Sequence, residues 1–240
     1  MHVISWNVER IKKRVGAAAI ANALINHEPS VIALHEFSEG EGGERLAERL
    51  NEVGYRTYAH PAREFPFRMI VFARHELELL VPPVFADDPF WVEARCAMLR
   101  ISAVHIPLRT KGYAEWRKAH WEGALSLART IGDRRHLIIG DLNTTLHGID
   151  EKYAAVPGNE YLRELESAGW VEAWRKVPPD PSLMEYSWYH PRPPHNGFRI
   201  DQAWMSAALT PLLQGARMDH KVRENKLSDH SMLIVDFDMI

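Results

Sequence analysis

The sequence predicts a layered α/β fold in which two β-sheets pack face to face and helices cover their outer faces. Short apolar runs typical of strands alternate with longer segments of helical periodicity along the whole chain. Both halves of the chain contain runs of both kinds, so each half can build one sheet with its own helices. The Pro-rich stretches 177–181 and 191–194 are typical of loops, and no stretch of linker composition separates the halves. We therefore expect residues 1–240 to form a single domain.

In the first half, residues 2–8 and 31–34 are apolar runs typical of buried strands. Between them, residues 12–27 have helical apolar spacing, and Pro29 ends that helix. Residues 43–53 predict a second helix, because their apolar side chains fall on one face. Runs rich in β-branched and aromatic residues then predict strands at 55–59, 68–73, 77–81 and 91–104.

In the second half, residues 113–131 form the longest segment with helical spacing, and residues 160–168 form a shorter one. The apolar run 136–139 between them predicts another buried strand. Three further runs predict the remaining strands at 186–190, 199–205 and 231–237.

The composition limits the class of protein. The chain has 240 residues, of which 46% are hydrophobic and 25% charged, and these fractions exclude a disordered chain. The formal net charge of −3 excludes a uniformly basic surface for nucleic acid but allows a local basic groove. The single cysteine, Cys96, excludes an internal disulfide and, with no signal-peptide pattern, favours a cytoplasmic protein. The most apolar stretch, residues 15–25, is too short to span a bilayer, so we expect no membrane association.

Polar residues gather at the ends of the expected strands, where functional groups of layered α/β folds tend to lie. Asp141 and Asn143 are two residues apart, and so are Arg199 and Asp201, so each pair should point the same way from an extended backbone. A carboxylate beside an amide suits a site that orients a water molecule and binds an anionic oxygen. Separated carboxylates without a cysteine cluster favour Mg²⁺ or Mn²⁺ over structural zinc. Taken singly, each signal has a structural alternative, such as a solvated strand end at Glu36 or a capped turn at Asp141.

Taken together, five short motifs resemble the endonuclease/exonuclease/phosphatase superfamily, which has a deoxyribonuclease-I-like fold. The motifs are SWNV at 5–8, ALHE at 33–36, IGDLN at 139–143, FRID at 198–201 and LSDHS at 227–231. The last two are the most specific, and the stretch from Tyr186 to His230 is most similar to the exonuclease III and abasic-site endonuclease branch. The resemblance implies a four-layer α-β-β-α sandwich of two mostly antiparallel sheets flanked by helices.

The resemblance also implies a role for each matched residue. The implied ligands of the Mg²⁺ or Mn²⁺ ion are Glu36, with Asn7 and Asp229 close to it. Asp141 would position or deprotonate the attacking water, and Asn143 would bind the phosphate or orient that water. His230 would contact a phosphate oxygen, with Asp201 holding its ring.

Three segments depart from the family pattern and leave the substrate open. His35 stands where the family usually has Gln, and in a strand it should point away from Glu36 and pack inside. His105 stands where exonuclease III relatives usually carry Tyr, and it is either a catalytic phosphate contact or a structural residue. Residues 65–69 replace a glycine-containing motif that is usual in DNA-cutting relatives.

Three features favour DNA as the substrate, and one of them is the loop 191–197, which is placed to reach a groove. Trp188, Phe198 and Ile200 match positions that in abasic-site nucleases line a pocket for a flipped-out sugar, the alternative being ordinary core residues. Basic residues near the motifs are candidates for phosphate contacts. We expect substrate binding by Arg199, Arg192 and Arg109, and a basic surface from Arg10, Lys12, Lys13, Arg14, Lys111, Lys221, Arg223 and Lys226.

The leading hypothesis is a Mg²⁺- or Mn²⁺-dependent monomeric phosphodiesterase that hydrolyses DNA, as an endonuclease or a 3′-exonuclease, with abasic sites as candidate targets. The alternative keeps the metal site but acts on a phosphorylated small molecule or a lipid head group. A non-catalytic binding module is disfavoured, because it would not need the whole set of site residues.

Overall fold

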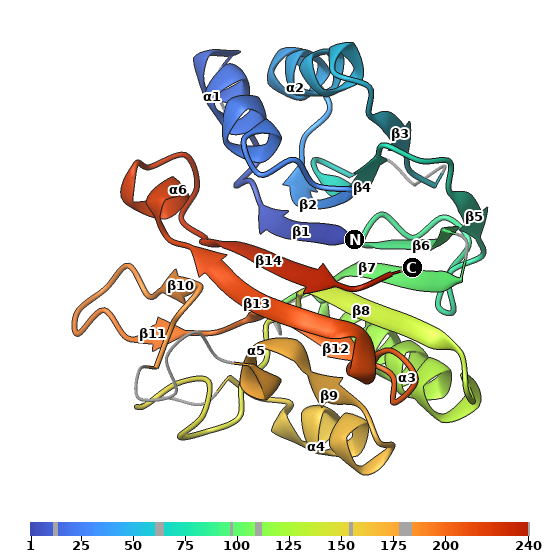
Figure 1. Ribbon diagram of the computed structural model, residues 1–240. Helices are drawn as coiled ribbons and strands as arrows, with labels where there is room; N and C mark the ends of the chain where they lie inside the picture. The colour runs from blue at the N-terminus through green and yellow to red at the C-terminus, as the bar shows by residue number, and fades with distance from the viewer. Residues whose placement is uncertain are drawn as a thin grey trace.

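The computed structural model describes residues 1–11, 14–60, 65–96, 98–108, 112–153, 156–177 and 184–239. Two six-stranded sheets stack face to face, and helices cover the outer face of each sheet (Figure 1). Within the described residues, parallel pairing is limited to β1 with β2 and β7 with β8, while the other paired strands are antiparallel. The four-layer α-β-β-α sandwich with mostly antiparallel sheets is thus confirmed.

The first sheet joins the two ends of the chain and has the strand order β13-β14-β1-β2-β4-β3. Its strands are β1 (His2–Asn7), β2 (Val31–Phe37), β3 (Arg56–Tyr58), β4 (Arg68–Ala73), β13 (Leu213–Asp219) and β14 (Met232–Phe237). Helices α1 (Arg14–Ile25) and α2 (Glu41–Glu52) cover its outer face, and the short α6 (Lys221–Glu224) follows β13 (Figure 1). Leu24 and Leu50 of these helices pack with Ile4 and Ile32 of the sheet.

The second sheet comes from the middle of the chain and has the order β5-β6-β7-β8-β12-β9. Its strands are β5 (Glu78–Leu80), β6 (Trp91–Cys96), β7 (Leu99–His105), β8 (Arg135–Asp141), β9 (Val171–Glu172) and β12 (Asp201–Met205). Helices α3 (Ala114–Thr130) and α4 (Asn159–Ser167) cover its outer face, where Trp121 packs with Trp91 and Trp204. The remaining elements are α5 (Ala173–Lys176), the 3-10 turn η1 (Thr210–Leu212) and the hairpin of β10 (Trp188–Tyr189) and β11 (Gly197–Phe198).

The core between the sheets is built from alternate residues of the facing strands. Ala33, Ala103, Ala203 and Leu233 are fully buried there, as the period of two along a strand requires. Gly140 allows an even closer approach inside β8, because a Cβ atom at this position would lie 1.8 Å from the carbonyl oxygen of Val104. This approach sets the end of β8, where Asp141 lies, tightly against β7.

The structure departs from the expected elements at the β6–β7 hairpin and at β13. The single strand expected at 91–104 is a hairpin of β6 and β7, in which Cys96 pairs with Leu99. The run contains no Gly, Pro, Asn or Asp to mark the turn, so its apolar pattern alone does not reveal the reversal. Strand β13 was not expected, because it lies at a sheet edge and of its side chains only Ala216 and Met218 are buried. Its apolar alternation is therefore weak.

Candidate active site

The structure brings strand ends from both sheets to one edge of the sandwich. Asn7 and Glu36 come from β1 and β2 of the first sheet, while Asp141 and Asp201 come from β8 and β12 of the second. His230 lies two residues before β14. A pocket of about 170 Å³ opens at this edge. The predicted site residues that line it are Asn7, Glu36, Asp141, Asn143, Trp188, Phe198, Ile200, Asp229 and His230.

Asp201 links the two sheets through His230. Nδ1 of His230 donates a hydrogen bond to Oδ2 of Asp201 at 2.8 Å, and Asp201 pairs in register with Asp141 in the adjacent strand. All three side chains are buried. Burial alone would lower the pKa of His230, but the charge and hydrogen bond of Asp201 outweigh it and raise that pKa to about 10. His230 is therefore an imidazolium at neutral pH, a suitable donor to an anionic oxygen.

Asp141 has the opposite electrostatic character, since it is a carboxylate that resists ionisation. Its burial, followed by the nearby charge of Asp201, raises the pKa of Asp141 to about 8. Oδ1 of Asp141 accepts a hydrogen bond from the backbone N–H of Asn143 at 3.1 Å. An elevated carboxyl pKa in a pocket is characteristic of groups that accept or release a proton during a reaction.

Asn7 joins the two carboxylates that flank it. Its Nδ2 donates to Oδ2 of Asp141 at 3.2 Å and to Oε1 of Glu36 at 3.4 Å. Its Oδ1 accepts the backbone N–H of Glu9 at 3.0 Å. Asn7 thus presents its amide nitrogen to both carboxylates, while its amide oxygen is engaged with the backbone.

Glu36 faces the pocket because β2 is irregular at this position. The register between β2 and β4 shifts between Leu34 and Phe37, and the backbone of Glu36 has a φ of 50°. A side chain in this left-handed conformation is uncommon, and such irregularities in a strand re-aim a side chain. Nε of Arg10 lies 3.3 Å from Oε2 of Glu36 and forms an ion pair with it.

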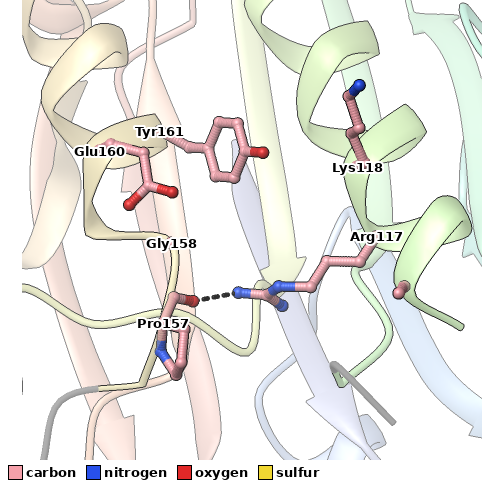
Figure 2. Close-up of a pocket in the computed structure, with 7 residues that line it drawn as sticks. Arg117, Lys118, Pro157, Gly158, Glu160 and Tyr161 are labelled. Carbon is pink, nitrogen blue, oxygen red and sulfur yellow. Dashed lines mark hydrogen bonds between the residues drawn. The ribbon is translucent and has the colours of Figure 1, made fainter. Parts of the chain in front are cut away.

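Arg117 braces the loops that carry the site, and sequence reasoning did not identify it. Its buried guanidinium donates to the carbonyl oxygens of Pro107 and Asn143, each at 3.1 Å. It also donates to the carbonyl oxygen of Pro157 at 2.6 Å, the bond that Figure 2 shows. Nδ2 of Asn143 in turn donates to the carbonyl oxygen of Ile106 at 3.0 Å. These bonds tie the loop after β7 to the loop after β8. Nothing in the sequence distinguishes Arg117 from the exposed charges of the same helix.

His35 packs between the sheets and points away from Glu36, as expected. Its Nδ1 accepts the backbone N–H of Asp141 at 2.9 Å, and its Nε2 lies 2.7 Å from Oγ of Ser5. Burial, followed by the charges of His105 and His230, holds the pKa of His35 well below its usual value. His35 is therefore a neutral ring that positions the backbone of Asp141.

His105 pairs in register with Asp141 in the parallel β7–β8 pair, yet it does not line the pocket described above. Burial lowers the pKa of His105 to about 3, so its ring is neutral. The ring lies nearly parallel to that of Phe67, with centroids 6.0 Å apart. His105 instead lines a neighbouring pocket, which it shares with Glu36.

Three apolar side chains form one wall of the pocket that Asp141 and His230 line. Trp188 and Phe198 pair across the β10–β11 hairpin with ring centroids 5.8 Å apart, and Ile200 follows them. Nε1 of Trp188 donates to Oδ2 of Asp229 at 2.9 Å, so this wall also holds Asp229 in place. The apolar and acidic sides of the pocket are thus joined by a direct hydrogen bond.

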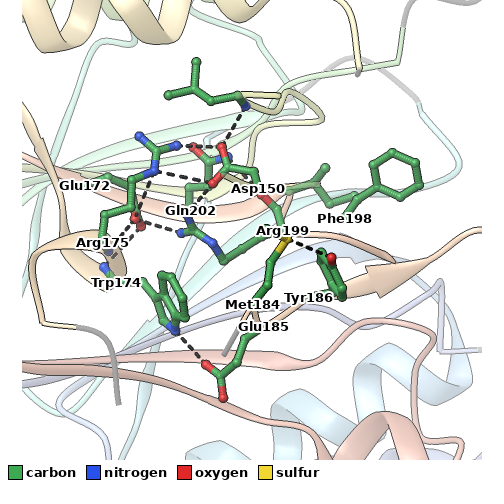
Figure 3. A network of polar contacts seen from close by, with 12 residues as sticks. Asp150, Glu172, Trp174, Arg175, Met184, Glu185, Tyr186, Phe198, Arg199 and Gln202 are labelled. Carbon is green, nitrogen blue, oxygen red and sulfur yellow. Dashed lines mark hydrogen bonds and ion pairs between the residues drawn. The ribbon is translucent and has the colours of Figure 1, made fainter. Parts of the chain in front are cut away.

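Arg199 lies in a different place from the expected one. Its side chain is fully buried on the far side of the chain from Phe198, where it pairs with Asp150 and with Oε2 of Glu172, the latter at 2.8 Å (Figure 3). Its guanidinium also stacks over the ring of Trp174 at 4.4 Å. The expectation that Arg199 binds substrate is therefore wrong, because its guanidinium is buried and already paired with two carboxylates and an indole ring.

The other predicted basic residues fall into a described group, made up of Arg192, Lys221, Arg223 and Lys226, and a group outside the described residues. Arg192 is exposed in the loop of the β10–β11 hairpin, and Arg223 stacks over the ring of Tyr189 at 4.5 Å. Both lie on the side of the site formed by that hairpin and α6. The predicted substrate contact Arg109 lies outside the described residues, as do Lys12, Lys13 and Lys111 and the side chain of Arg14.

The donor set of the site fits a hard divalent cation. Within the described part of the chain, His35, Asp141 and Asp201 form a cluster whose donor atoms all lie within 4.8 Å of one another. Both ring nitrogens of His35 are already engaged, so the carboxylates are the available donors. Oδ1 of Asp201 is buried without a hydrogen-bond partner among the described residues. Carboxylate oxygens of this kind are the preferred ligands of Mg²⁺ and Mn²⁺.

Comparison with known proteins places this chain in a family. A model of the endonuclease/exonuclease/phosphatase family matches residues 4–230, so the chain belongs to that family, whose members are hydrolytic enzymes. A search of curated proteins finds no match.

Among solved structures, an AP endonuclease from Archaeoglobus fulgidus is similar, with a TM-score of 0.83 and 18% identity. A 3′-5′ exonuclease from Neisseria meningitidis is similar with a TM-score of 0.80 and 19% identity. A 3′ phosphatase from Neisseria bound to a product DNA hairpin has a TM-score of 0.80 and 18% identity. Each alignment covers 100% of both chains. At this identity, the comparisons establish the shared fold.

No helix in the described ranges is long and apolar enough to cross a bilayer.

Proposed function

We propose that the protein is a Mg²⁺- or Mn²⁺-dependent phosphodiesterase that hydrolyses DNA as an endonuclease or a 3′-exonuclease, with abasic sites among its targets. The observation that carries the proposal is the buried pair of Asp141 and the His230–Asp201 couple in one pocket. One group can take a proton from water, and the other can donate to a phosphate oxygen. In this proposal residues 1–240 act as one catalytic domain and as a monomer.

The chemistry follows from the state of each group. Asp141 orients the attacking water and accepts its proton once the carboxyl is ionised. The imidazolium of His230 donates its Nε2–H to a non-bridging phosphate oxygen, while Asp201 fixes the ring through Nδ1. Asn143 lies within the same pocket and binds the phosphate or helps to orient the water. Together these groups stabilise the charge that develops during in-line attack.

The cation would be held by Glu36, with the carboxylates of Asp141 and Asp229 close by, and Asn7 would set the spacing between Glu36 and Asp141. A bound divalent cation neutralises charge on the phosphoryl oxygens and on the leaving oxygen. The neutral His105 is proposed as a substrate contact on the side of the pocket beyond Glu36.

DNA is supported by the apolar wall and by the basic side chains beside it. Trp188, Phe198 and Ile200 enclose a space that suits a sugar without a stacked base. Arg192 and Arg223 lie where a phosphate backbone could pass the same hairpin. The related Neisseria 3′ phosphatase is described in complex with DNA. Hydrolysis of a small phosphorylated molecule or lipid head group by the same site is the second candidate, favoured by the small volume of the pocket.

A substrate panel with purified protein tests the proposal. Plasmid nicking, 3′-end digestion and abasic-site cleavage are measured beside phosphomonoesters and lipid head groups, with Mg²⁺, with Mn²⁺ and with a chelator. Asp141→Ala should lose activity, whereas Asp133→Ala, an exposed acidic residue far from the site, serves as the matched control. Hydrolysis of phosphomonoesters or lipids without any cleavage of nucleic acid would contradict the proposal. Activity that survives chelation would contradict the metal requirement.

A further inference from the structure

A second pocket lies beside the candidate active site and shares two of its walls. It has a volume of about 170 Å³, and the rings of Phe67, Phe90, His105 and Tyr113 line it. Glu36 and Leu108 line both this pocket and the catalytic one. The two cavities therefore adjoin at Glu36 and Leu108. The hydrolytic roles of Asp141 and His230 leave this second pocket unexplained.

The walls of the second pocket favour a flat ligand. The ring centroids of Phe67 and Phe90 are 5.7 Å apart, and those of Phe90 and Tyr113 are 6.4 Å apart. The guanidinium of Arg10 lies over the face of Phe67 at 4.5 Å. Aromatic faces and a stacked guanidinium are the surfaces on which unpaired bases stack in proteins that bind single strands.

The polar atoms of the pocket narrow the ligand further. Nδ1 of His105 is buried and makes no hydrogen bond with any residue that the structure describes. The ring of His105 is neutral, so it suits an uncharged hydrogen-bonding edge. An anionic group would face the carboxylate of Glu36, and a hydrocarbon chain would leave Nδ1 of His105 without a polar partner. A heteroaromatic ring with polar edges can stack on the aromatic walls and also form a hydrogen bond with His105.

We propose that this second pocket binds one unpaired nucleobase, that of the nucleotide across the cleaved bond from the one held by the Trp188 wall. The inference rests on the proposed function and deepens it. The pocket is below the roughly 300 Å³ typical of ligand pockets, so it holds one ring system rather than a base pair. A base inside it is withdrawn from its stack, and the preferred substrate is therefore single-stranded or frayed DNA at the cleaved bond.

The test uses the thymidine dinucleotide TpT and two analogues, each of which lacks one of the two bases. In the wild type, removal of one particular base should lower kcat/KM by about tenfold, the effect of losing a stacked base. In Phe67→Ala, removal of that same base should leave kcat/KM unchanged. Phe67→Ala and the wild type should therefore cleave the analogue that lacks this base with the same kcat/KM. Phe85→Ala, at an exposed ring outside the pocket, is the matched control and should behave like the wild type.

Tyr113→Ala provides a second variant of the pocket wall, in case the first one does not fold. Equal losses on base removal in the wild type and in both pocket variants would overturn the subsite. A preference for fully paired duplex over single strands of the same sequence would overturn it as well.

A binding measurement separates failure of the subsite from failure of the proposed function. The inactive Asp141→Asn variant is titrated with the same three compounds by NMR, with and without Phe67→Ala. Binding that is tighter with one of the two bases present, and that loses this dependence in Phe67→Ala, supports the subsite. If the wild type nevertheless cleaves no DNA, only the proposed function is overturned. Binding that is independent of both bases overturns the subsite even if DNA is cleaved.

Discussion

Asp201 lies directly opposite Asp141 across β8 and β12, so two buried carboxylates share one desolvated space beside His230. The negative charge of Asp201 is balanced by the imidazolium that it binds, while Asp141 is left with a pKa of about 8. This relationship determines which groups of the site are protonated. Near neutral pH without a bound cation, His230 and Asp141 both carry protons.

The first prediction concerns pH. Activity should rise with pH as Asp141 ionises and fall as His230 loses its proton near pH 10, which gives a bell-shaped kcat/KM profile with an alkaline optimum. A bound cation lowers the pKa of a neighbouring carboxyl, so the acid limb should lie below pH 8 in the loaded enzyme.

In Asp201→Asn, the pKa of His230 should fall, because its negatively charged partner is gone. The alkaline limb should then move to lower pH, and kcat should drop by a factor on the order of 10²–10³. The pH profile and an NMR titration of His230 measure both effects. An alkaline limb that stays in place in this variant would show that His230 is not the acid.

The second prediction concerns Arg117. Arg117→Met removes the bonds that tie the loops of Pro107 and Asn143 together, so kcat should fall by about 10²-fold with little change in KM. The orphaned carbonyl oxygens should also lower the free energy of unfolding by about 3 kcal/mol. Arg117→Lys should recover part of the activity, and Arg49→Met on the exposed face of α2 is the control. Wild-type kcat in a stably folded Arg117→Met would refute the bracing role.

The third prediction contrasts two arginines. Arg199→Met leaves Arg175 as the remaining arginine beside the buried carboxylates of Asp150 and Glu172, and the broken buried ion pairs should lower the free energy of unfolding by about 3–5 kcal/mol. Arg192→Ala should leave stability unchanged but weaken DNA binding and reduce the slope of log affinity against log salt by about one. Urea unfolding and salt-dependent binding distinguish the two. A lower salt slope in Arg199→Met, measured where the variant is folded, would restore the rejected role of Arg199.

The fourth prediction concerns acid stability and His136. This ring is fully buried, and desolvation lowers its pKa to about 3, against 6.5 in the unfolded chain. A histidine with a depressed folded pKa binds fewer protons when folded, so its contribution to stability is complete above pH 6.5 and is lost as the pH falls towards 3. Between pH 7.5 and pH 5.5, the loss should be about 1.4 kcal/mol. In urea unfolding, the stability of His136→Gln should fall less between pH 7.5 and pH 5.5 than that of the wild type. An identical dependence of the free energy of unfolding on pH in both proteins would contradict this role of His136.

Local patterns predict much of the fold. Continuous apolar runs marked β1, β2, β4 and β8, and helical spacing marked α2 and α3 close to their observed bounds. Edge strands escape such reasoning, as β13 shows, because a half-exposed strand has few apolar residues to display. The β6–β7 turn escapes it for a different reason, since its backbone reverses without the residues that usually mark a turn.

The site could be predicted only where it depends on strand ends. Asp141 ends β8, Asp201 begins β12 and His230 lies two residues before β14, so the three converge at the same edge. Arg199 shows the limit of the spacing argument. A spacing of two residues aligns side chains only within one continuous strand, and β12 begins at Asp201, so Arg199 points towards Asp150 instead. Arg117 and the second pocket depend on contacts between distant segments, which spacing along the chain does not encode.

The hydrogen bonds that build the site also fasten one sheet to the other. His35 and Asn7 of the first sheet both hold Asp141 of the second, and His230 holds Asp201. Slippage of the two layers against each other would break these bonds together. A partly unfolded state in which the two sheets have separated should therefore have no catalytic activity. On heating or in denaturant, enzymatic turnover should vanish in the same cooperative transition as the native fold, so turnover itself reports whether the sandwich is closed.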